Sequence, residues 1–285
     1  MRAAVRGTEI YFDIEGAGLV PDGAAMREKR AALVIHGGPG GDHSGFKPSF
    51  TPLSEALQLV YFDHRGQGRS GRGDPALYTL DENVEDMEAL RRHLGLGPVV
   101  SIGTSYGGMV AMAHAARYPD AVSHLVLCVT AAHGGFIPRA EAIVAARGTE
   151  AQKRVCATLW AGGFRTSEEL QEYYAIMGPL YSTRFDAAAA GAVRGRARPS
   201  PEPLNLAFGP GGFLRTMDLR PELSRITAPT LILAGREDWI CAPEFSEEIH
   251  ALMPGSRLAV FEGASHSLRV DVPEALRGAI LGFLG

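Results

Sequence analysis

Hydrophobic residues form strand-like runs in some segments of the chain and recur at helical spacing in others. These two patterns take turns along the sequence and predict strands separated by helices. Residues 3–14 alternate apolar and polar side chains around Gly7 and Thr8, which predicts a short antiparallel hairpin at a sheet edge. The polar, glycine-containing stretch that follows, up to Arg30, is predicted to be a loop. Continuous apolar runs are typical of strands buried on both faces. Such runs occupy residues 31–35, 59–62, 99–102, 125–129, 230–234 and 258–261.

Apolar residues at helical spacing lie between these predicted strands. Residues 83–94 show this spacing and end at Gly95, a residue that often terminates helices. Further helices are predicted over residues 52–57, from Gly108 to about Tyr118, and over residues 243–252 and 273–283. Because buried strands alternate with helices, the chain is predicted to form a mostly parallel, doubly wound α/β sheet.

The alternation of strands and helices stops between residues 131 and 219. This segment contains alanine-rich and amphipathic stretches, such as residues 168–177 and 186–192, and no run that predicts a strand. We therefore predict that residues 1–130 and 220–285 form the α/β core and that residues 131–219 form a helical cap inserted into it.

Composition narrows the range of functions. With 285 residues, 46% hydrophobic and 21% charged, the chain has the composition of a globular protein with one large α/β domain and an insertion. A formal net charge of -4 provides no basic field for nucleic acid or an anionic membrane, so small molecules or short peptides are the expected substrates. The first residues lack an apolar signal core and no stretch is apolar for long enough to span a bilayer, which predicts a cytoplasmic protein. We expect a monomer or small homo-oligomer.

The three cysteines are far apart and odd in number, so they are interpreted as reduced packing residues. No cluster of histidines and cysteines has the spacing of metal ligands, and no cofactor is predicted. Residues 66–71 match the glycine pattern of a dinucleotide site. However, residues 72–75 read as a loop and not as the helix that would bind a pyrophosphate.

The sequence Gly103-Thr104-Ser105-Tyr106-Gly107 lies between a predicted strand and a predicted helix. This context favours a nucleophile elbow, in which a strained turn projects the serine hydroxyl and the glycines avoid collisions with neighbouring backbone. Such a pentapeptide pattern occurs by chance in a chain with 35 glycines, so the interpretation depends on the flanking strand and helix. The backbone N–H of Tyr106, at the start of the helix, can stabilise an oxyanion.

A serine nucleophile needs a base and an acid that orients the base. His266 follows the predicted strand at 258–261, and Asp238 follows the one at 230–234. Both therefore lie where open α/β sheets bind ligands, and the chain order serine, acid, histidine fits this architecture. Glu237 is the alternative acid. The other histidines considered are interpreted as packing or surface residues: His64, His93, His114, His124 and His250.

Several motifs together resemble the α/β-hydrolase fold, and within it most closely the proline iminopeptidase family. They are His36-Gly37-Gly38-Pro39-Gly40, Asp63-x-Arg65-Gly66-x-Gly68-x-Ser70, Gly103-Thr104-Ser105-Tyr106-Gly107-Gly108, Gly235-Arg236-x-Asp238 and Ser265-His266. The resemblance covers residues 30–130 and 225–285 and does not extend over the insertion. It implies a Ser105, His266 and Asp238 triad acting through an acyl-enzyme, with an oxyanion hole formed by the amides of Gly38 and Tyr106. Asp63 and Arg65 would brace their loop.

The same resemblance implies release of N-terminal residues from small peptides, and here the chain departs from its pattern. Aminopeptidases of this kind pair the substrate ammonium with glutamates, one of them next to the triad aspartate in the tricorn-interacting branch, where this chain has Trp239. Cap glutamates available as replacements are Glu168, Glu169, Glu172 and Glu202. Substrate contacts are predicted from Gly37, Trp239, Trp160, Phe136 and Glu202.

Two other functions remain open from the sequence. An esterase or lactonase for small apolar acyl groups is the first, because cap aromatics can hold an acyl chain as well as a prolyl ring. These aromatics are Phe136, Trp160, Phe164, Tyr173, Tyr174 and Phe208. A ligand-binding protein without turnover is the second, and the presence of all three triad residues disfavours it. Arg194, Arg196 and Arg198 are interpreted as solvent-facing, with contact to a substrate carboxylate as the alternative.

Overall fold

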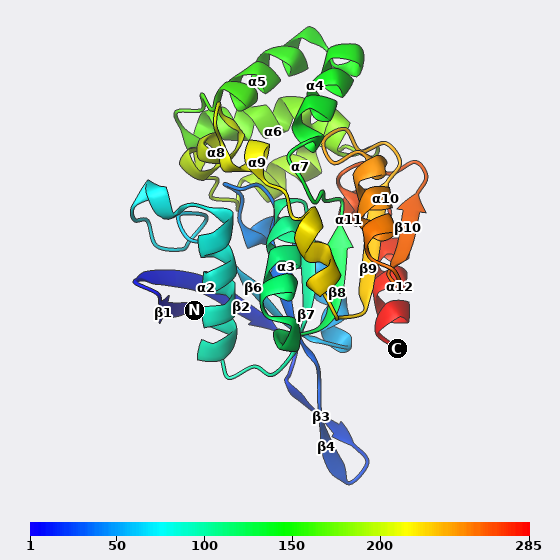
Figure 1. Cartoon of the computed structure of the whole chain (residues 1–285). Helices are drawn as coiled ribbons and strands as arrows, with labels where there is room; N and C mark the ends of the chain where they lie inside the picture. The colour runs from blue at the N-terminus through cyan, green and yellow to red at the C-terminus, as the bar shows by residue number, and fades with distance from the viewer.

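A sheet of eight strands runs through the centre of the molecule, as shown by a computed structural model that describes residues 1–285 (Figure 1). The strands lie in the order β1-β2-β6-β5-β7-β8-β9-β10, and those from β6 to β10 are parallel to one another. β1 and β2 form the predicted antiparallel hairpin at the edge. The bounds are β1 (Arg2–Val5), β2 (Thr8–Glu15), β5 (Ala31–Ile35), β6 (Gln58–Phe62), β7 (Val99–Thr104), β8 (Val122–Cys128), β9 (Thr230–Gly235) and β10 (Arg257–Phe261). The α/β fold with a mostly parallel sheet is confirmed.

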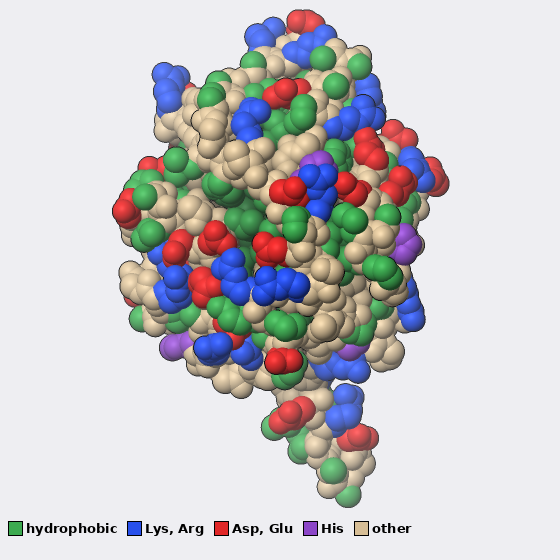
Figure 2. Space-filling model, in the orientation of Figure 1, with side chains coloured by type: hydrophobic (Ala, Val, Ile, Leu, Met, Phe, Trp, Pro, Cys, Tyr) green, Lys and Arg blue, Asp and Glu red, His purple; other side chains and the backbone are tan.

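The prediction of a loop before Arg30 is wrong, because residues 19–28 form a second hairpin. β3 (Leu19–Asp22) pairs antiparallel with β4 (Ala25–Glu28), and Gly23 in the turn has a φ of +61°. This hairpin extends away from the body of the molecule, on the side opposite the helices α4 to α8 (Figures 1 and 2). Its strands contain no buried residue, so the sequence lacks the apolar alternation that marks a half-buried strand.

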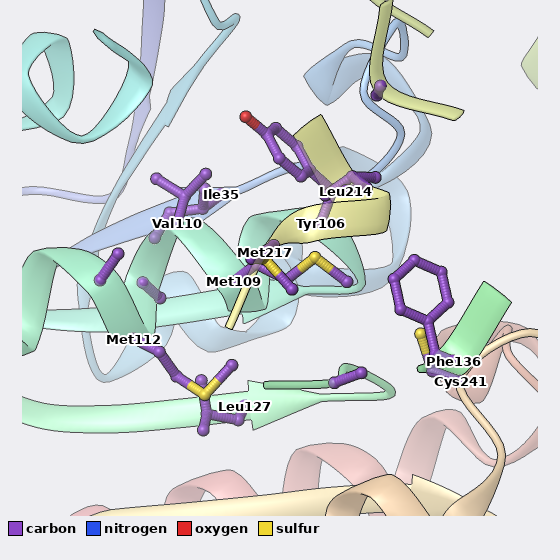
Figure 3. Close-up of a cluster of buried hydrophobic side chains, with 14 of the residues drawn as sticks. Ile35, Tyr106, Met109, Val110, Met112, Leu127, Phe136, Leu214, Met217 and Cys241 are labelled. Carbon is purple, nitrogen blue, oxygen red and sulfur yellow. The ribbon is translucent and has the colours of Figure 1, made fainter. Parts of the chain in front are cut away.

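Helices cover both faces of the sheet because successive residues of each buried strand point to opposite sides. Leu33 and Ile35 of β5 pack into one hydrophobic cluster, and Ala32 and Val34 pack into the other. The first cluster lies under α2 (Leu80–His93), α3 (Tyr106–Arg117) and α10 (Pro243–Leu252), and the second under α1 (Lys47–Phe50), α11 (Leu268–Asp271) and α12 (Pro273–Leu284). Figure 3 shows Met109, Val110 and Met112 of α3 within the first cluster.

Short 3-10 turns connect these elements: η1 (His43–Gly45), η2 (Thr51–Glu55), η3 (Pro75–Leu77), η4 (Pro119–Ala121) and η5 (Arg220–Arg225). η2 occupies most of the segment predicted as a helix over residues 52–57. Residues 66–74 form a loop, as expected. All three cysteines are free and buried, which agrees with their interpretation as packing residues. No helix in the structure combines the length and hydrophobicity that a membrane span requires.

Six helices follow β8 and lie together at one end of the sheet (Figure 1). They are α4 (Phe136–Arg147), α5 (Glu150–Ala161), α6 (Ser167–Tyr181), α7 (Ala187–Arg194), α8 (Pro201–Phe208) and α9 (Phe213–Thr216), and we call residues 136–216 the cap. The chain enters and leaves it side by side, because Gly134 N–H donates to Met217 O at 2.8 Å and Leu219 N–H donates to Ala132 O at 2.7 Å. Side-chain oxygens of Thr149, Thr166 and Asp186 accept the backbone N–H of the third residue of α5, α6 and α7, respectively.

Candidate active site

Ser105 occupies a strained turn between β7 and α3. Its φ of 56° and ψ of -123° lie outside the regions that non-glycine residues usually adopt. The surrounding chain fixes this conformation, since Ser105 N–H donates to Cys128 O at 2.9 Å and the Thr130 hydroxyl donates to Ser105 O at 2.7 Å. The turn therefore has the geometry expected of a nucleophile elbow.

Glycines surround Ser105 because no side chain fits beside it. A Cβ at Gly103 would lie 2.3 Å from Gly107 O, and a Cβ at Gly107 would lie 2.2 Å from Ile35 O. Both approaches are far closer than real Cβ contacts. A Cβ at Gly37 would lie 3.0 Å from the Ser105 Cβ, which brings the loop after β5 directly against the elbow.

His266 and Asp238, predicted from two separate strand ends, meet in the structure. His266 Nδ1 lies 2.7 Å from Asp238 Oδ2, and both residues are buried. The other carboxylate oxygen of Asp238 accepts hydrogen bonds from the amides of Ile240 at 2.9 Å and Cys241 at 3.1 Å. This arrangement holds the imidazole with its Nδ1–H toward the carboxylate and leaves Nε2 available as a base.

Glu237, the alternative acid, lies outside this arrangement. Its side chain is 45% exposed and pairs with Arg147 at 3.4 Å, whereas the Asp238 side chain is 0% exposed. Of these two neighbouring carboxylates, the structure brings only Asp238 to His266.

Ser105 and His266 line the same cavity, which has a volume of about 360 Å³ and lies between the cap and the carboxyl ends of the strands. The thiol of Cys241, in the turn that carries Asp238, is buried. Burial raises its pKa and the Asp238 carboxylate raises it further, while a hydrogen bond with the Ser105 hydroxyl has the opposite effect.

Two backbone amides close to Ser105 are suited to an oxyanion. Gly38 lines the cavity, its φ of +123° requires glycine, and its N–H makes no hydrogen bond within the chain. Tyr106 is the first residue of α3, so its N–H has no helical partner. Its side chain points elsewhere, toward Asn83, whose Nδ2 donates to the Tyr106 hydroxyl at 2.6 Å.

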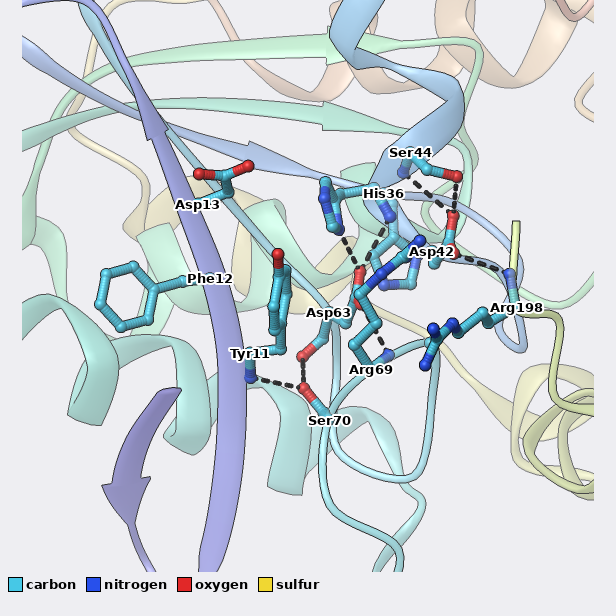
Figure 4. A network of polar contacts seen from close by, with 12 residues as sticks. Tyr11, Phe12, Asp13, His36, Asp42, Ser44, Asp63, Arg69, Ser70 and Arg198 are labelled. Atoms are coloured by element: carbon cyan, nitrogen blue, oxygen red, sulfur yellow. Dashed lines mark hydrogen bonds and ion pairs between the residues drawn. The ribbon is translucent and has the colours of Figure 1, made fainter. Parts of the chain in front are cut away.

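Asp63 and Arg65 brace the loop after β6 through internal contacts. Asp63 lies 2.7 Å from His43 Nδ1 and accepts the backbone N–H of Arg69 at 2.8 Å (Figure 4). Burial alone would raise the pKa of Asp63, but the hydrogen bond from His43 and the surrounding histidines lower it overall. Arg65 donates two hydrogen bonds of 2.6 Å to Asp86. The side chains of Asp63 and Arg65 therefore make their hydrogen bonds within the protein.

Of the five predicted substrate contacts, only Gly37 lines the cavity. Trp239 is fully buried against Tyr181, with ring centroids 5.3 Å apart, and Phe136 is buried in the hydrophobic core. Trp160 packs on Phe208, and Glu202 is exposed on α8. These four positions are therefore not assigned to substrate contact.

Three of the six aromatic residues that line the cavity come from α6. Tyr174, Gly178 and Tyr181 are spaced at four and three residues, so they share one side of the helix. Tyr173 and Phe208, both predicted as cap aromatics, also border the cavity, as do Phe46 and Phe185. The helical spacing from Tyr174 to Tyr181 places these residues on one side of α6, but it does not reveal from the sequence that this side faces the cavity.

The chain is similar in sequence and structure to known hydrolases. A family model described as the alpha/beta hydrolase fold matches residues 32–271. The proline iminopeptidase PfmaB of Pestalotiopsis fici is 31% identical over 269 residues, which cover 92% of this chain and 94% of that protein. An esterase from Thermogutta terrifontis, solved with malate bound, is similar in structure with a TM-score of 0.75 and 27% identity, covering 100% of this chain and 98% of the esterase. An enol-lactonase from Burkholderia xenovorans LB400 shares the fold with a TM-score of 0.71 and 24% identity, over 100% of this chain and 99% of the lactonase.

Proposed function

Because this chain belongs to the alpha/beta hydrolase fold family, we propose that it is a serine hydrolase in which Ser105, His266 and Asp238 form the catalytic triad. The observation that carries the proposal is the 2.7 Å contact between His266 and Asp238 at the cavity that Ser105 lines. The residues are those that acyl transfer requires: a strained serine, a base with its tautomer fixed, and a buried carboxylate.

In the proposed first step, the Ser105 hydroxyl oxygen attacks the carbonyl carbon of the substrate while His266 Nε2 takes its proton. The carbonyl oxygen becomes negatively charged and accepts hydrogen bonds from the amides of Gly38 and Tyr106. The resulting imidazolium is stabilised by Asp238. It gives its proton to the leaving oxygen or nitrogen as the bond between this atom and the carbonyl carbon breaks, which leaves the acyl group on Ser105.

The second step regenerates the enzyme. A water molecule attacks the acyl-Ser105 carbonyl, and His266 takes the proton from that water. When the tetrahedral intermediate collapses, the bond between carbonyl carbon and Ser105 Oγ breaks and the proton returns to the serine. The products are a carboxylic acid and the free hydroxyl of Ser105.

The composition of the cavity supports ester, lactone or amide substrates that have no free amine beside the scissile bond. An ammonium group in a partly dry site needs a carboxylate partner. No glutamate lines the cavity. The replacement candidates in the cap lie elsewhere: Glu168, Glu172 and Glu202 are exposed, and Glu169 pairs with Arg165.

The two aspartates at the cavity already have partners. Asp42 is buried and accepts hydrogen bonds from Ser44, from Arg69 at 2.8 Å and from the backbone N–H of Arg198 at 2.8 Å (Figure 4). Asp186 is exposed and accepts the N–H of Ala189 as the cap of α7. Asp42 is thus fully engaged, whereas Asp186 forms no ion pair but lies at the exposed rim, where an ammonium group stays hydrated.

Proline iminopeptidase activity is the second candidate function, and the relative that is 31% identical favours it. The motifs of the core, from His36 to His266, also resemble that family. For this activity the substrate ammonium would have to bind Asp186, or Asp42 after this residue has released its present partners.

One comparison of substrates separates the two candidates. Purified protein is assayed on prolyl and N-acetyl-prolyl p-nitrophenyl esters, on prolyl anilide and on an acyl lactone. An ester or lactone hydrolase should hydrolyse the N-acetyl ester at least as well as the free amine. An aminopeptidase should lose roughly 10²-fold in kcat/KM on N-acetylation, the scale of truncating a desolvated charge pair.

The Ser105→Ala variant is the control in every assay. Turnover that persists in this variant would belong to a contaminating enzyme or to a different nucleophile, and in the second case the proposed function is wrong.

A further inference from the structure

Three arginines line the cavity, and none of them has an acidic partner. Arg184 follows α6, Arg194 ends α7, and Arg269 lies in α11, three residues after His266. Most of the other arginines in the chain contact a carboxylate within 4 Å, as Arg65 does with Asp86. The side chains of Arg184, Arg194 and Arg269 form no such pair, so the cavity carries net positive charge even when the exposed Asp186, which also forms no ion pair, is counted.

Arg269 is partly buried, and of the three arginine side chains it alone makes a hydrogen bond. Its guanidinium lies over the ring of Phe46, 4.8 Å from the ring centroid, and its Nε–H donates to Gly45 O at 3.2 Å. These contacts fix the plane of the guanidinium but use only one of its five donors. Burial lowers the pKa of Arg269, and the charge of Asp271 opposes this effect.

The carboxylates closest to Arg269 in the chain and in the cavity are engaged elsewhere. Asp271 accepts hydrogen bonds from Ser182 Oγ and from the Ser265 amide. Asp42 pairs with Arg69 at 2.8 Å. Partly removing an arginine from water without an anion is unfavourable, and a ligand that supplies the missing charge relieves this cost.

We propose that the substrate carries a carboxylate that Arg269 binds, with Arg194 and Arg184 contributing at the rim of the same cavity. A guanidinium presents parallel N–H donors that match the two oxygens of a carboxylate. Since Ser105 and Arg269 line one cavity of about 360 Å³, a small substrate reaches both at once. The substrate class is thus a half-ester or half-amide of a dicarboxylic acid, or a lactone that carries a separate carboxylate. This inference rests on the proposed hydrolase function.

Matched esters test the inference directly. The p-nitrophenyl monoester of glutaric acid carries a free carboxylate, and p-nitrophenyl pentanoate has the same acyl chain length without it. The enzyme should hydrolyse the anionic ester with a kcat/KM about 10-fold or more above that of the neutral ester. Added NaCl should reduce this ratio, because it screens the charges that make the difference.

Variants then assign the preference to named side chains. Arg269→Met should lower the ratio of the two kcat/KM values by about 10-fold or more, chiefly through KM for the anionic ester. Arg194→Glu should lower it as well. Arg194 makes no hydrogen bond or ion pair through its side chain, so this variant keeps the test open if Arg269→Met does not fold. Arg154→Met is the matched control, because Arg154 is exposed on α5, away from the cavity, and has no partner.

The outcomes separate the inference from the function on which it rests. Equal kcat/KM values for the two esters, or a preference that survives in both Arg269→Met and Arg194→Glu, would overturn the carboxylate site. Hydrolysis that depends on Ser105 would leave the hydrolase proposal intact in that case. Hydrolysis of both esters that is unchanged in Ser105→Ala would overturn the hydrolase proposal itself.

Discussion

Ser182 and Asp271 come from different layers of the molecule, yet the Ser182 hydroxyl donates a hydrogen bond to the buried Asp271 carboxylate. The other oxygen of this carboxylate accepts the amide of Ser265 at 2.7 Å. Ser267 N–H donates in turn to Tyr181 O at 2.8 Å. The end of α6 and the loop that carries His266 are therefore joined on both sides of the histidine, which couples the position of the cap to that of the base.

Removing the hydrogen bond between Ser182 and Asp271 should make the position of His266 less fixed. Ser182→Ala leaves an Asp271 oxygen without its hydroxyl donor, and we expect the free energy of unfolding to fall by about 1–3 kcal/mol. We also expect kcat on a small ester to fall severalfold, because His266 is held less firmly against Asp238. Urea denaturation and ester kinetics measure the two effects. Ser224→Ala, at an exposed serine without a side-chain partner, is the control, and equal behaviour of the two variants would exclude the link.

Ser105→Ala should abolish hydrolysis and keep the fold. Alanine can adopt the backbone conformation of the elbow about as well as serine can, but the covalent step requires the serine Oγ. We expect a loss of about 10³-fold or more in kcat, in scale with other triad deletions. A fluorophosphonate should label the wild type once, and peptide mapping should find the label on Ser105. A label on any other residue would relocate the nucleophile.

The strands of the core were predictable because their environment leaves a strong pattern. β7 and β9 are buried at every residue, and each appears in the sequence as an apolar run. Asp238 and His266 could be paired before the structure because both follow such runs. β3 and β4 could not be predicted, since their side chains face solvent and Leu19 and Met26 remain 52% and 59% exposed.

The lining of the cavity was the least predictable feature. An aromatic residue in the cap packs between helices or faces the cavity, and both choices have the same helical spacing. Phe136 and Trp160 pack between helices, whereas Tyr174 lines the cavity. The sequence did not indicate the position of Arg269 at the cavity either. An arginine without an acidic partner is recognised only once its neighbours in space are known.

Asp238→Asn should cost far more activity than Glu237→Gln. An asparagine presents either an amide N–H or a neutral oxygen to His266, so the imidazole loses its fixed tautomer and its stabilising charge. The expected loss in kcat is about 10³-fold or more for Asp238→Asn and less than about twofold for Glu237→Gln, whose side chain faces solvent. Steady-state kinetics on one ester decide the comparison, and a larger loss from Glu237→Gln would transfer the role of the acid.

Stability should fall in acid through Glu88. Burial opposes ionisation of this carboxyl, but hydrogen bonds from Arg91, His114 and Arg92 more than offset it and lower its pKa well below the usual 4.5. A lowered pKa in the folded state stabilises the protein above the unfolded-state pKa, and this contribution is lost as the pH falls through the folded-state pKa. The difference in unfolding free energy between wild type and Glu88→Gln should thus be constant above about pH 5 and shrink below it.

Urea denaturation at a series of pH values from 7 to 3 measures this difference. Glu274→Gln is the matched control, because the Glu274 side chain is 78% exposed. If the curves of wild type and Glu88→Gln stay parallel down to pH 3, the ion cluster around Glu88 does not contribute as described.

Two glycine-to-alanine substitutions in helices should have effects of opposite sign. At Gly107 the new Cβ would lie 2.2 Å from Ile35 O and must displace the backbone of β5, the strand that leads to Gly37 and Gly38. We expect a loss of about 3 kcal/mol or more in stability, together with a loss of hydrolysis from the displaced elbow. At Gly278 in α12 the Cβ meets nothing within 4 Å. There alanine restricts the unfolded chain and favours the helix, so stability should rise by about 0.4–1 kcal/mol with unchanged kcat. Denaturant unfolding of both variants measures the pair, and a mild effect at Gly107 would mean that the elbow tolerates a side chain where the structure leaves no space for one.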